Sequence, residues 1–300
     1  MKNHRFVWCT LAPAFLLLGC FYIYPIVFNV QNSLTDTSLF QLRDGGPHIG
    51  AANYRELFAS PDFFRVLWNT AFWLTFVGVG LRILLGLALA LALHSRTIAR
   101  YRLKTLARLV LIVPWATPPI VSIIIFKWLL DPRVGDLNLA LVRMGLVSEP
   151  IAFLGSTHWV WPVILMIVVW NTLPLVTLSF VAALQSVPDE LVEAARIDGA
   201  TALQVVRHVH LPHLKPAIIV MVLMSTFWTF NNFVYVWLTT GAGPGSFTNV
   251  MATDVFIKAF IDGRLGMSSA MGVVMAAAML VFGIVYLRVV AAREFREVLR

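Results

Sequence analysis

The stretch ELVEAARIDGA, residues 190–200, places acidic and small side chains together in an otherwise apolar chain. Its carboxylates come from Glu190, Glu193 and Asp198, and Gly199 stops the run. Carboxylates can pair with Arg or Lys side chains of another protein, and small residues allow its backbone to approach closely. The small residues are Ala194, Ala195, Gly199 and Ala200. The segment therefore suits protein docking, although a solvated amphipathic turn would have the same composition.

No pattern in the chain indicates catalysis or a bound cofactor. The sequence has no G-x-x-x-x-G-K, H-E-x-x-H or C-x-x-C motif, and no nucleophile–base pair stands out. The one metal-like cluster is HVHLPH, which contains His208, His210 and His213. Their spacings do not put all three imidazoles on one helix face, and Pro212 interrupts the run. We therefore expect solvated histidines at a membrane surface, no metal, no cofactor and no enzymatic activity in this chain.

Two apolar stretches carry polar residues that could contact a solute. In the later stretch Ser225, Thr229 and Asn232 follow an i, i+4, i+7 spacing, which predicts one helix face, and Asn231 lies beside it. The earlier stretch combines an aromatic ring with polar groups in Trp170, Asn171 and Thr172. Sugars are bound by hydrogen-bonding side chains and flat aromatic surfaces, and this set offers both. Hydrogen bonds between helices are the alternative role.

Arg82 is the only charged residue deep inside an apolar stretch. Such a residue normally faces a bundle interior or a watery cavity. It could meet an anionic substrate such as a sugar phosphate, or make a structural bond to a neighbouring helix.

The composition predicts that these residues are positioned by membrane-spanning helices. The 300 residues are 59% hydrophobic and 13% charged, with a mean hydropathy of +0.81, whereas a soluble domain carries about 25% charged residues. The 10 Trp and 21 Phe residues fit a bilayer protein with aromatic belts. The formal charge of +8 is not concentrated in one block, so we expect lipid rather than nucleic acid as a partner.

Six apolar stretches are long enough to span a bilayer, which takes about 20 residues. They lie near residues 7–32, 67–93, 106–130, 157–183, 216–239 and 267–290. Basic residues favour the cytoplasmic side, and the strongest basic cluster is Arg96, Arg100, Arg102, Lys104 and Arg108. Both termini and the docking segment are then cytoplasmic. The predicted fold is an all-α membrane protein with six transmembrane helices, a single domain over residues 1–300.

The segment around residues 185–215 is predicted to be a helical hairpin between the fourth and fifth spans. Pro188 suits a first helical turn, and Asp189 and Glu190 favour the positive end of a helix dipole. Gly199 supplies a left-handed stop. A second short helix is expected over residues 201–209, ended by Pro212 and Pro216.

This segment resembles the hallmark loop of the membrane subunits of binding-protein-dependent ABC importers. The pattern is Glu-Ala-Ala at 193–195, three intervening residues, Gly199, nine intervening residues, Val209, one more residue, and then Leu211-Pro212. Val209 replaces the usual Ile. The resemblance implies a coupling helix that docks into a cleft of a separate ATPase subunit and transmits nucleotide-driven motion. The residues it implicates are Glu193, Ala194, Ala195, Asp198, Gly199, Ala200, Leu211 and Pro212.

Other segments are similar to the carbohydrate branch of that family, which includes maltose-type and glycerol-phosphate-type permease subunits. They are YPI at 24–26, GAANY at 50–54, WLLDPRVGDLNLAL at 128–141 and LTTGAGP at 238–244. The chain lacks the extra spans and large outer domain of the maltose-type subunit. The resemblance implies a second homologous permease, two ATPase subunits, an extracytoplasmic sugar-binding protein and a sugar substrate. It also implies the cytoplasmic (inner) membrane of a bacterium or archaeon.

The resemblance also bears on the substrate path, because the two polar stretches match segments that touch sugar in the maltose-type subunit. Asn171, Thr172 and Thr229 depart from that relative, so the sugar can differ. Two other functions compete with this interpretation. A secondary, ion-coupled transporter of small polar solutes would need paired acids in its spans, and an intramembrane enzyme would need a catalytic constellation; the sequence has neither.

Overall fold

The computed structural model describes residues 4–41, 45–95 and 104–291. Within these ranges the regular elements are all helices, and the only extended pairings are the isolated bridges Thr35–His48 and Ser38–Arg264. The chain divides into two compact units, one formed by residues 1–65 with 254–280 and the other by residues 66–253 with 281–300.

The first unit joins the beginning of the chain to a late segment. Its helices are α1 (His4–Leu18), the π-helical η1 (Gly19–Ile23), α2 (Tyr24–Ser33), the short 3-10 turn η2 (Leu39–Gln41), α3 (Ala52–Ala59), the start of α4 (Pro61–Trp68), the end of α15 (Met251–Phe256), η5 (Ile257–Ile261) and most of α16 (Leu265–Tyr286). The buried Asn53 side chain donates to the carbonyls of Ser33, at 3.0 Å, and Thr35, at 2.9 Å. Arg264 and Glu56 form a bidentate pair at 2.6 and 2.7 Å. These bonds hold the segment after α2 against α3 and the start of α16.

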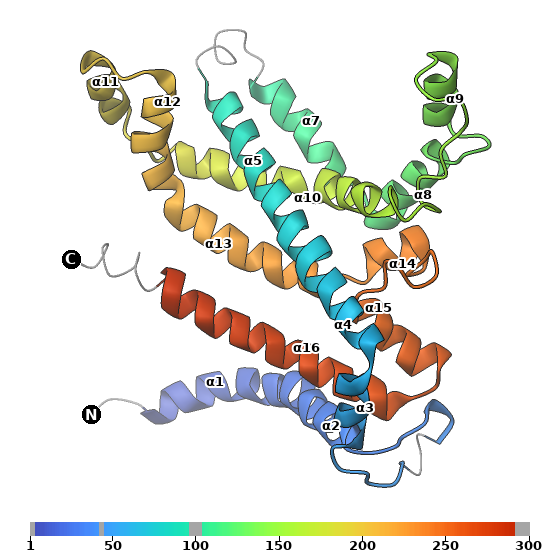
Figure 1. Ribbon diagram of the computed structural model, residues 1–300. Helices are drawn as coiled ribbons and strands as arrows, with labels where there is room; N and C mark the ends of the chain where they lie inside the picture. The colour runs from blue at the N-terminus through green and yellow to red at the C-terminus, as the bar shows by residue number, and fades with distance from the viewer. Residues whose placement is uncertain (1–3, 42–44, 96–103, 292–300) are drawn as a thin grey trace. The chain divides into compact units, whose positions relative to one another are not determined.

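The second unit is built around α10 (Val160–Leu184). Its other elements are η3 (Asn69–Val77), α5 (Gly78–His94), α7 (Lys104–Ala116), α8 (Pro119–Leu129), α9 (Asp136–Arg143), α11 (Asp189–Ile197), α12 (Ala202–Val205), η4 (Val206–His210), α13 (Leu211–Phe230), α14 (Val234–Thr240) and η6 (Leu287–Ala291). Val160, Ile164 and Ile167 of α10 are fully buried. α5 packs along α10, and a Cβ at Gly86 would lie only 2.9 Å from Val176 Cγ1. Glycine therefore permits this close helix crossing, which Figure 1 shows.

The helices partly reproduce the six predicted spans. Five are long and apolar enough to cross a membrane: Thr10–Ser33, Pro61–His94, Val160–Leu184, Ala202–Phe230 and Leu265–Val290. The third predicted span, 106–130, is a pair of helices, Leu109–Ala116 and Pro119–Leu129, bent by 96°. The bend has a clear cause, because Thr117 and Pro118 each precede a proline, which disfavours helical backbone, and Pro118 is extended. The described residues thus hold five spans, or six if this pair is one span.

The fifth predicted span is also wrong in its boundaries. The helix runs without a break from Ala202 to Phe230 and ends there, and α14 starts at Val234. Pro212 and Pro216 were expected to end a short helix, yet both lie within this long one. The π-helical turn η4 ends at His210, two residues before Pro212, and its i→i+5 hydrogen bonds widen the helix locally. Pro212 lies in the first turn of α13 and has no backbone N–H. An N–H group in the first turn of a helix has no obligatory acceptor, so its absence costs little there.

Candidate functional site

The first leg of the α11–α12 hairpin has much of the predicted local structure, whereas the second leg, predicted as a short helix over residues 201–209, continues to Phe230. Pro188 is the N-cap residue of α11 rather than part of its first turn, and it makes no side-chain capping bond. Asp189 and Glu190 occupy the first turn, where carboxylates stabilise the positive end of the helix dipole. Gly199 has a φ of +82°, which confirms the predicted left-handed stop. Its amide donates to the Arg196 carbonyl at 3.0 Å, and the Ala200 amide donates to the Ala195 carbonyl at 2.9 Å. Together these bonds form a Schellman motif that ends the helix.

The second leg of the hairpin begins with a reciprocal cap. The Thr201 hydroxyl accepts from the Gln204 amide, and the Gln204 side chain accepts from the Thr201 amide at 2.7 Å. The turn between the two legs is therefore fixed from both sides. Ile197 and Leu203 flank this turn and are 86% and 77% exposed. Two large apolar side chains held in solvent beside an ordered turn are typical of a protein-docking surface.

The predicted docking residues all belong to this hairpin or to the start of α13. The exposed ones are Glu193, Ala194, Asp198, Gly199 and Pro212, and the partly buried ones are Ala195, Ala200 and Leu211. The exposed set lies around the ordered turn and on the helix that follows it. Ile197 and Leu203 were missed because apolar residues in a hairpin are normally predicted to pack inward.

The histidine prediction is wrong at one position. His208 and His213 are exposed, and their Nδ1 atoms lie 3.0 and 2.8 Å from the carbonyls of Gln204 and Val209. His210 is only 8% exposed. Its ring meets that of His94, at the end of α5, edge to face with 5.5 Å between centroids. It is buried because it lies on the face of the long helix that packs toward α5.

Asn171 joins α10 to the bend between α7 and α8. Its amide nitrogen donates to the Pro114 carbonyl at 2.7 Å and to the Thr117 carbonyl at 3.2 Å, two groups that the broken helix leaves without partners. Its amide oxygen accepts from the Tyr235 hydroxyl of α14. Asn171 is 4% exposed, so the structure places it as a link between helices.

The break between α13 and α14 is capped on both sides by asparagine. The Asn231 side chain donates to the Phe227 carbonyl at 2.9 Å, in the last turn of α13. The Asn232 oxygen accepts from the Tyr235 amide at 3.1 Å, in the first turn of α14. Because the helix ends at Phe230, Asn232 does not continue the predicted face of Ser225 and Thr229. The predicted stripe of three residues is therefore two buried residues followed by a cap.

Arg82 lies in the interior, as predicted for a charge within a span. It is 2% exposed, and its Nη2 atom donates to the Thr229 hydroxyl at 3.1 Å. Thr229 is in the last turn of α13, where the negative end of the helix dipole favours a cation. Within the described residues the guanidinium has no carboxylate partner, and its Nε atom makes no hydrogen bond.

The remaining predicted solute contacts differ in accessibility. Trp170 is 36% exposed, lies edge to face with Phe126 and borders an apolar groove with Leu81 and Leu85. Thr172 is partly buried and donates to the Val168 carbonyl of its own helix at 2.6 Å. Ser225 is fully buried, and its hydroxyl makes no hydrogen bond within the described part of the chain.

Sequence reasoning missed Tyr235 and Ser122, which complete the polar junction around Asn171. The Asn171 amide lies 3.3 Å from the Ser122 hydroxyl. The signal was present in the sequence, since the TPP triplet at 117–119 predicts a helix break and a break needs polar partners.

The sequence profile described as "Binding-protein-dependent transport system inner membrane component" matches residues 82–296. A probable ABC transporter permease protein of Brucella suis is 32% identical over 295 residues, covering 98% of this chain and 99% of the relative. The sulfoquinovosyl glycerol transport system permease protein of Agrobacterium fabrum is 33% identical over 288 residues, covering 95% and 90%. The trehalose/maltose transport system permease protein of Thermococcus litoralis is 32% identical over 277 residues, covering 92% and 90%.

A solved structure supports the same fold. A chain of a bacterial ABC transporter involved in the import of the acidic polysaccharide alginate superposes with a TM-score of 0.81 over 96% of both chains, at 21% identity. This chain thus shares its overall fold with that transporter chain.

Proposed function

This chain belongs to the family of binding-protein-dependent transport system inner membrane components, and we propose that it forms half of the translocation path for a sugar or sugar derivative in an ABC importer. The observation that carries the proposal is the hairpin, because its Schellman turn presents the family pattern in an ordered and exposed form. The family is one of transport permeases rather than enzymes, and the chemistry of ATP hydrolysis belongs to a separate partner subunit.

The substrate class rests on the relatives. Two permeases about one-third identical to this chain along most of their lengths serve a sulfoquinovosyl glycerol system and a trehalose/maltose system. The alginate transporter, whose fold this chain shares, imports a polysaccharide. The partly exposed Trp170, Thr172 and Asn232 offer an aromatic surface and hydrogen-bonding groups of the kind that sugars need. Asn171, Ser225 and Thr229 are buried, and Asn171 bonds the bend between α7 and α8 and Tyr235 of α14.

The hairpin couples this path to ATP hydrolysis. Ile197, Leu203 and the small residues at the turn form the surface that enters the ATPase cleft, while Glu193 and Asp198 pair with basic groups at its rim. The second leg is continuous with α13 up to Phe230. A 29-residue helix is roughly 44 Å long, so a displacement of the hairpin moves Thr229 and the α13–α14 break as one rigid element.

The assembly follows from these roles. Two homologous permeases enclose one path, two ATPase subunits receive the two hairpins, and an extracytoplasmic sugar-binding protein delivers substrate. The alginate transporter was also solved with its periplasmic protein bound to an alginate pentasaccharide. The complex is placed in the cytoplasmic membrane of a bacterium or archaeon, with both termini of this single-domain subunit in the cytoplasm.

The test is Gly199→Val in the reconstituted importer. A Cβ at Gly199 meets no atom of the chain within 4 Å, so the change adds backbone strain of roughly 1–2 kcal/mol and bulk on the docking surface. Gly145→Val is the matched control, because Gly145 has a φ of +69° and equally open surroundings in a different loop. We expect Gly199→Val to abolish uptake and ATPase stimulation by the loaded binding protein, whereas Gly145→Val retains both. Normal stimulation in Gly199→Val would disprove the coupling role.

A further inference from the structure

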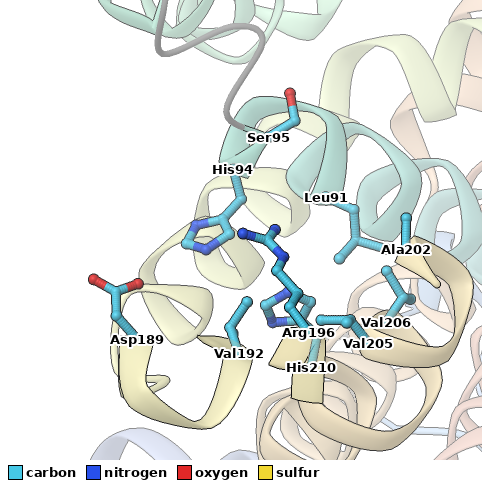
Figure 2. Close-up of a pocket in the computed structure, with 10 residues that line it drawn as sticks. All are labelled: Leu91, His94, Ser95, Asp189, Val192, Arg196, Ala202, Val205, Val206 and His210. Carbon is cyan, nitrogen blue, oxygen red and sulfur yellow. The ribbon is translucent and has the colours of Figure 1, made fainter. Parts of the chain in front are cut away.

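A pocket of about 450 Å³ lies between the hairpin and the end of α5 (Figure 2). This volume falls in the range of roughly 300–1,000 Å³ that small-ligand sites occupy. Three elements line it: the end of α5, the α11 leg, and the second leg where α12 passes into η4. The pocket is therefore located where the coupling hairpin meets the transmembrane helices.

One part of the pocket lining is basic. Arg196 of α11, His94 of α5 and His210 of η4 all border the pocket, and Figure 2 shows their nitrogen-bearing groups within the same cluster. The centroids of the two imidazole rings are 5.5 Å apart. The Nδ1 atom of the buried His210 makes no hydrogen bond within the described residues. Asp189 is the one carboxylate in the lining, and it is exposed.

The rest of the lining is mostly apolar. Leu91, Val192, Val205 and Val206 supply aliphatic surface beside the basic group. A guanidinium and two imidazoles in one lining, with Asp189 as the exposed carboxylate among the lining residues, favour an anion. The aliphatic surface favours a ligand with an uncharged part next to that anion.

We propose that this pocket binds a phosphate group, and that the bound group ties the hairpin to α5. The guanidinium of Arg196 and the imidazoles of His94 and His210 are the donors, and planar guanidinium is well suited to bidentate phosphate bonds. The headgroup of an anionic phospholipid and a free cytoplasmic phosphorylated compound share this chemistry. Basic pockets between helices on the cytoplasmic side are known to hold anionic headgroups. If the hairpin couples transport to ATP hydrolysis as proposed above, the ligand would regulate coupling, because it links α11 of the hairpin to the end of α5.

The experiment uses the complete importer in nanodiscs, with the thermal unfolding midpoint as the readout. One arm compares discs of phosphatidylcholine with discs that also contain phosphatidylglycerol, and the other adds inorganic phosphate to the neutral discs. Arg196→Gln removes the bidentate donor, and Arg196→Lys restores the charge alone. Arg207→Gln is the matched control, because Arg207 is exposed on the second leg and does not line the pocket.

We expect one probe to stabilise the wild type, with an apparent affinity roughly tenfold weaker in Arg196→Gln, equivalent to about 1.4 kcal/mol, and partly recovered in Arg196→Lys. Arg207→Gln should respond as the wild type does. A response to phosphatidylglycerol alone identifies a lipid headgroup, and a response to phosphate in neutral discs identifies a soluble ligand. ATPase subunits bind phosphate themselves, so only the difference between wild type and variant counts. Equal weakening in Arg196→Gln and Arg207→Gln, or a wild type that responds to neither probe, overturns the proposal.

Discussion

The bond between Arg82 and Thr229 permits a sharp test of how this chain tolerates a charge inside its second unit. Thr229→Val removes the acceptor of the 3.1 Å bond and changes little else, because valine has almost the shape of threonine. Arg82→Met removes the charge and keeps an unbranched apolar stem. The two single changes and the double change complete a thermodynamic cycle.

The single changes are expected to differ in their effect on the free energy of unfolding, with Thr229→Val more destabilising than Arg82→Met. Thr229→Val removes the Thr229 hydroxyl that the buried Arg82 bonds among the described residues, and an unsatisfied buried polar group costs about 1–3 kcal/mol. Bonds between membrane helices average only about 0.6 kcal/mol, but the charge on this donor favours the upper part of the range. Arg82→Met removes the buried charge together with its bond, and such replacements are often neutral or stabilising. The double variant should therefore resemble Arg82→Met, with the effect of Thr229→Val abolished.

The assay is thermal unfolding of the purified importer. Thr172→Val is the control for loss of a hydroxyl, because Thr172 donates only to a carbonyl of its own helix, and we expect it to change stability by less than about 0.5 kcal/mol. Additive effects of Arg82→Met and Thr229→Val would refute the reasoning, since they would show that the two side chains act independently. If uptake per assembled complex falls in Arg82→Met while stability does not, Arg82 acts on the substrate path as well.

Three further predictions test other parts of the molecule. Asn232→Leu should lower uptake per assembled complex roughly 5- to 100-fold, because one hydrogen bond to substrate is worth about 1–3 kcal/mol. Asn232→Ser keeps an oxygen that can cap α14. Normal uptake in Asn232→Ser would show that Asn232 acts only as a helix cap. The hydrogen bond from Arg264, followed by the charges of Arg264 and Lys258, lowers the pKa of Glu56 below 4.5, so the stabilisation by this ion pair is present at neutral pH and is lost as the pH falls through the lowered pKa. The side chains of Glu56 and Arg264 are 55% and 40% exposed, which limits the effect of the pair on stability to less than about 1 kcal/mol. A difference in unfolding midpoint between the wild type and Glu56→Gln that persists at acidic pH would contradict this prediction. Cysteines placed at Ser60, Ser148 or Ser246 should react with an impermeant reagent from outside, whereas cysteines at Ser95 or Gln204 should not, and external labelling at Ser95 would reverse the predicted topology.

The sequence was most informative where structure depends on local chemistry. Gly199 was predicted to be left-handed because a charged, helix-forming run stops at it, and its φ of +82° agrees. Arg82 was predicted to lie in the interior because an exposed charge within an apolar helix is costly. Each inference needed only a residue and its neighbours along the chain.

Errors arose where distant segments decide the outcome. The stripe of Ser225, Thr229 and Asn232 fits a helix perfectly, but a helix can end inside a membrane protein if other side chains satisfy its backbone. Here Asn231 and Asn232 do so, and Tyr235 connects the break to Asn171 on α10. The sequence pattern of residues 216–239 carries no information about Asn171, because Asn171 lies on α10.

The prolines led to the opposite error, because a helix was predicted to end where it in fact continues. Pro212 and Pro216 were predicted to end the second helix of the hairpin, and a break at that place would separate the hairpin from the fifth span. The π-helical turn at Val206–His210 instead lets the helix continue through Pro212. A single rigid helix then extends from the capped turn at Thr201 to the Arg82–Thr229 bond, and the first interruption comes at Asn231. Because α14 is held to α10 through Tyr235 and Asn171 while α13 is continuous with the hairpin, we propose that displacement of the hairpin is converted into a change in the proposed substrate path at the α13–α14 break.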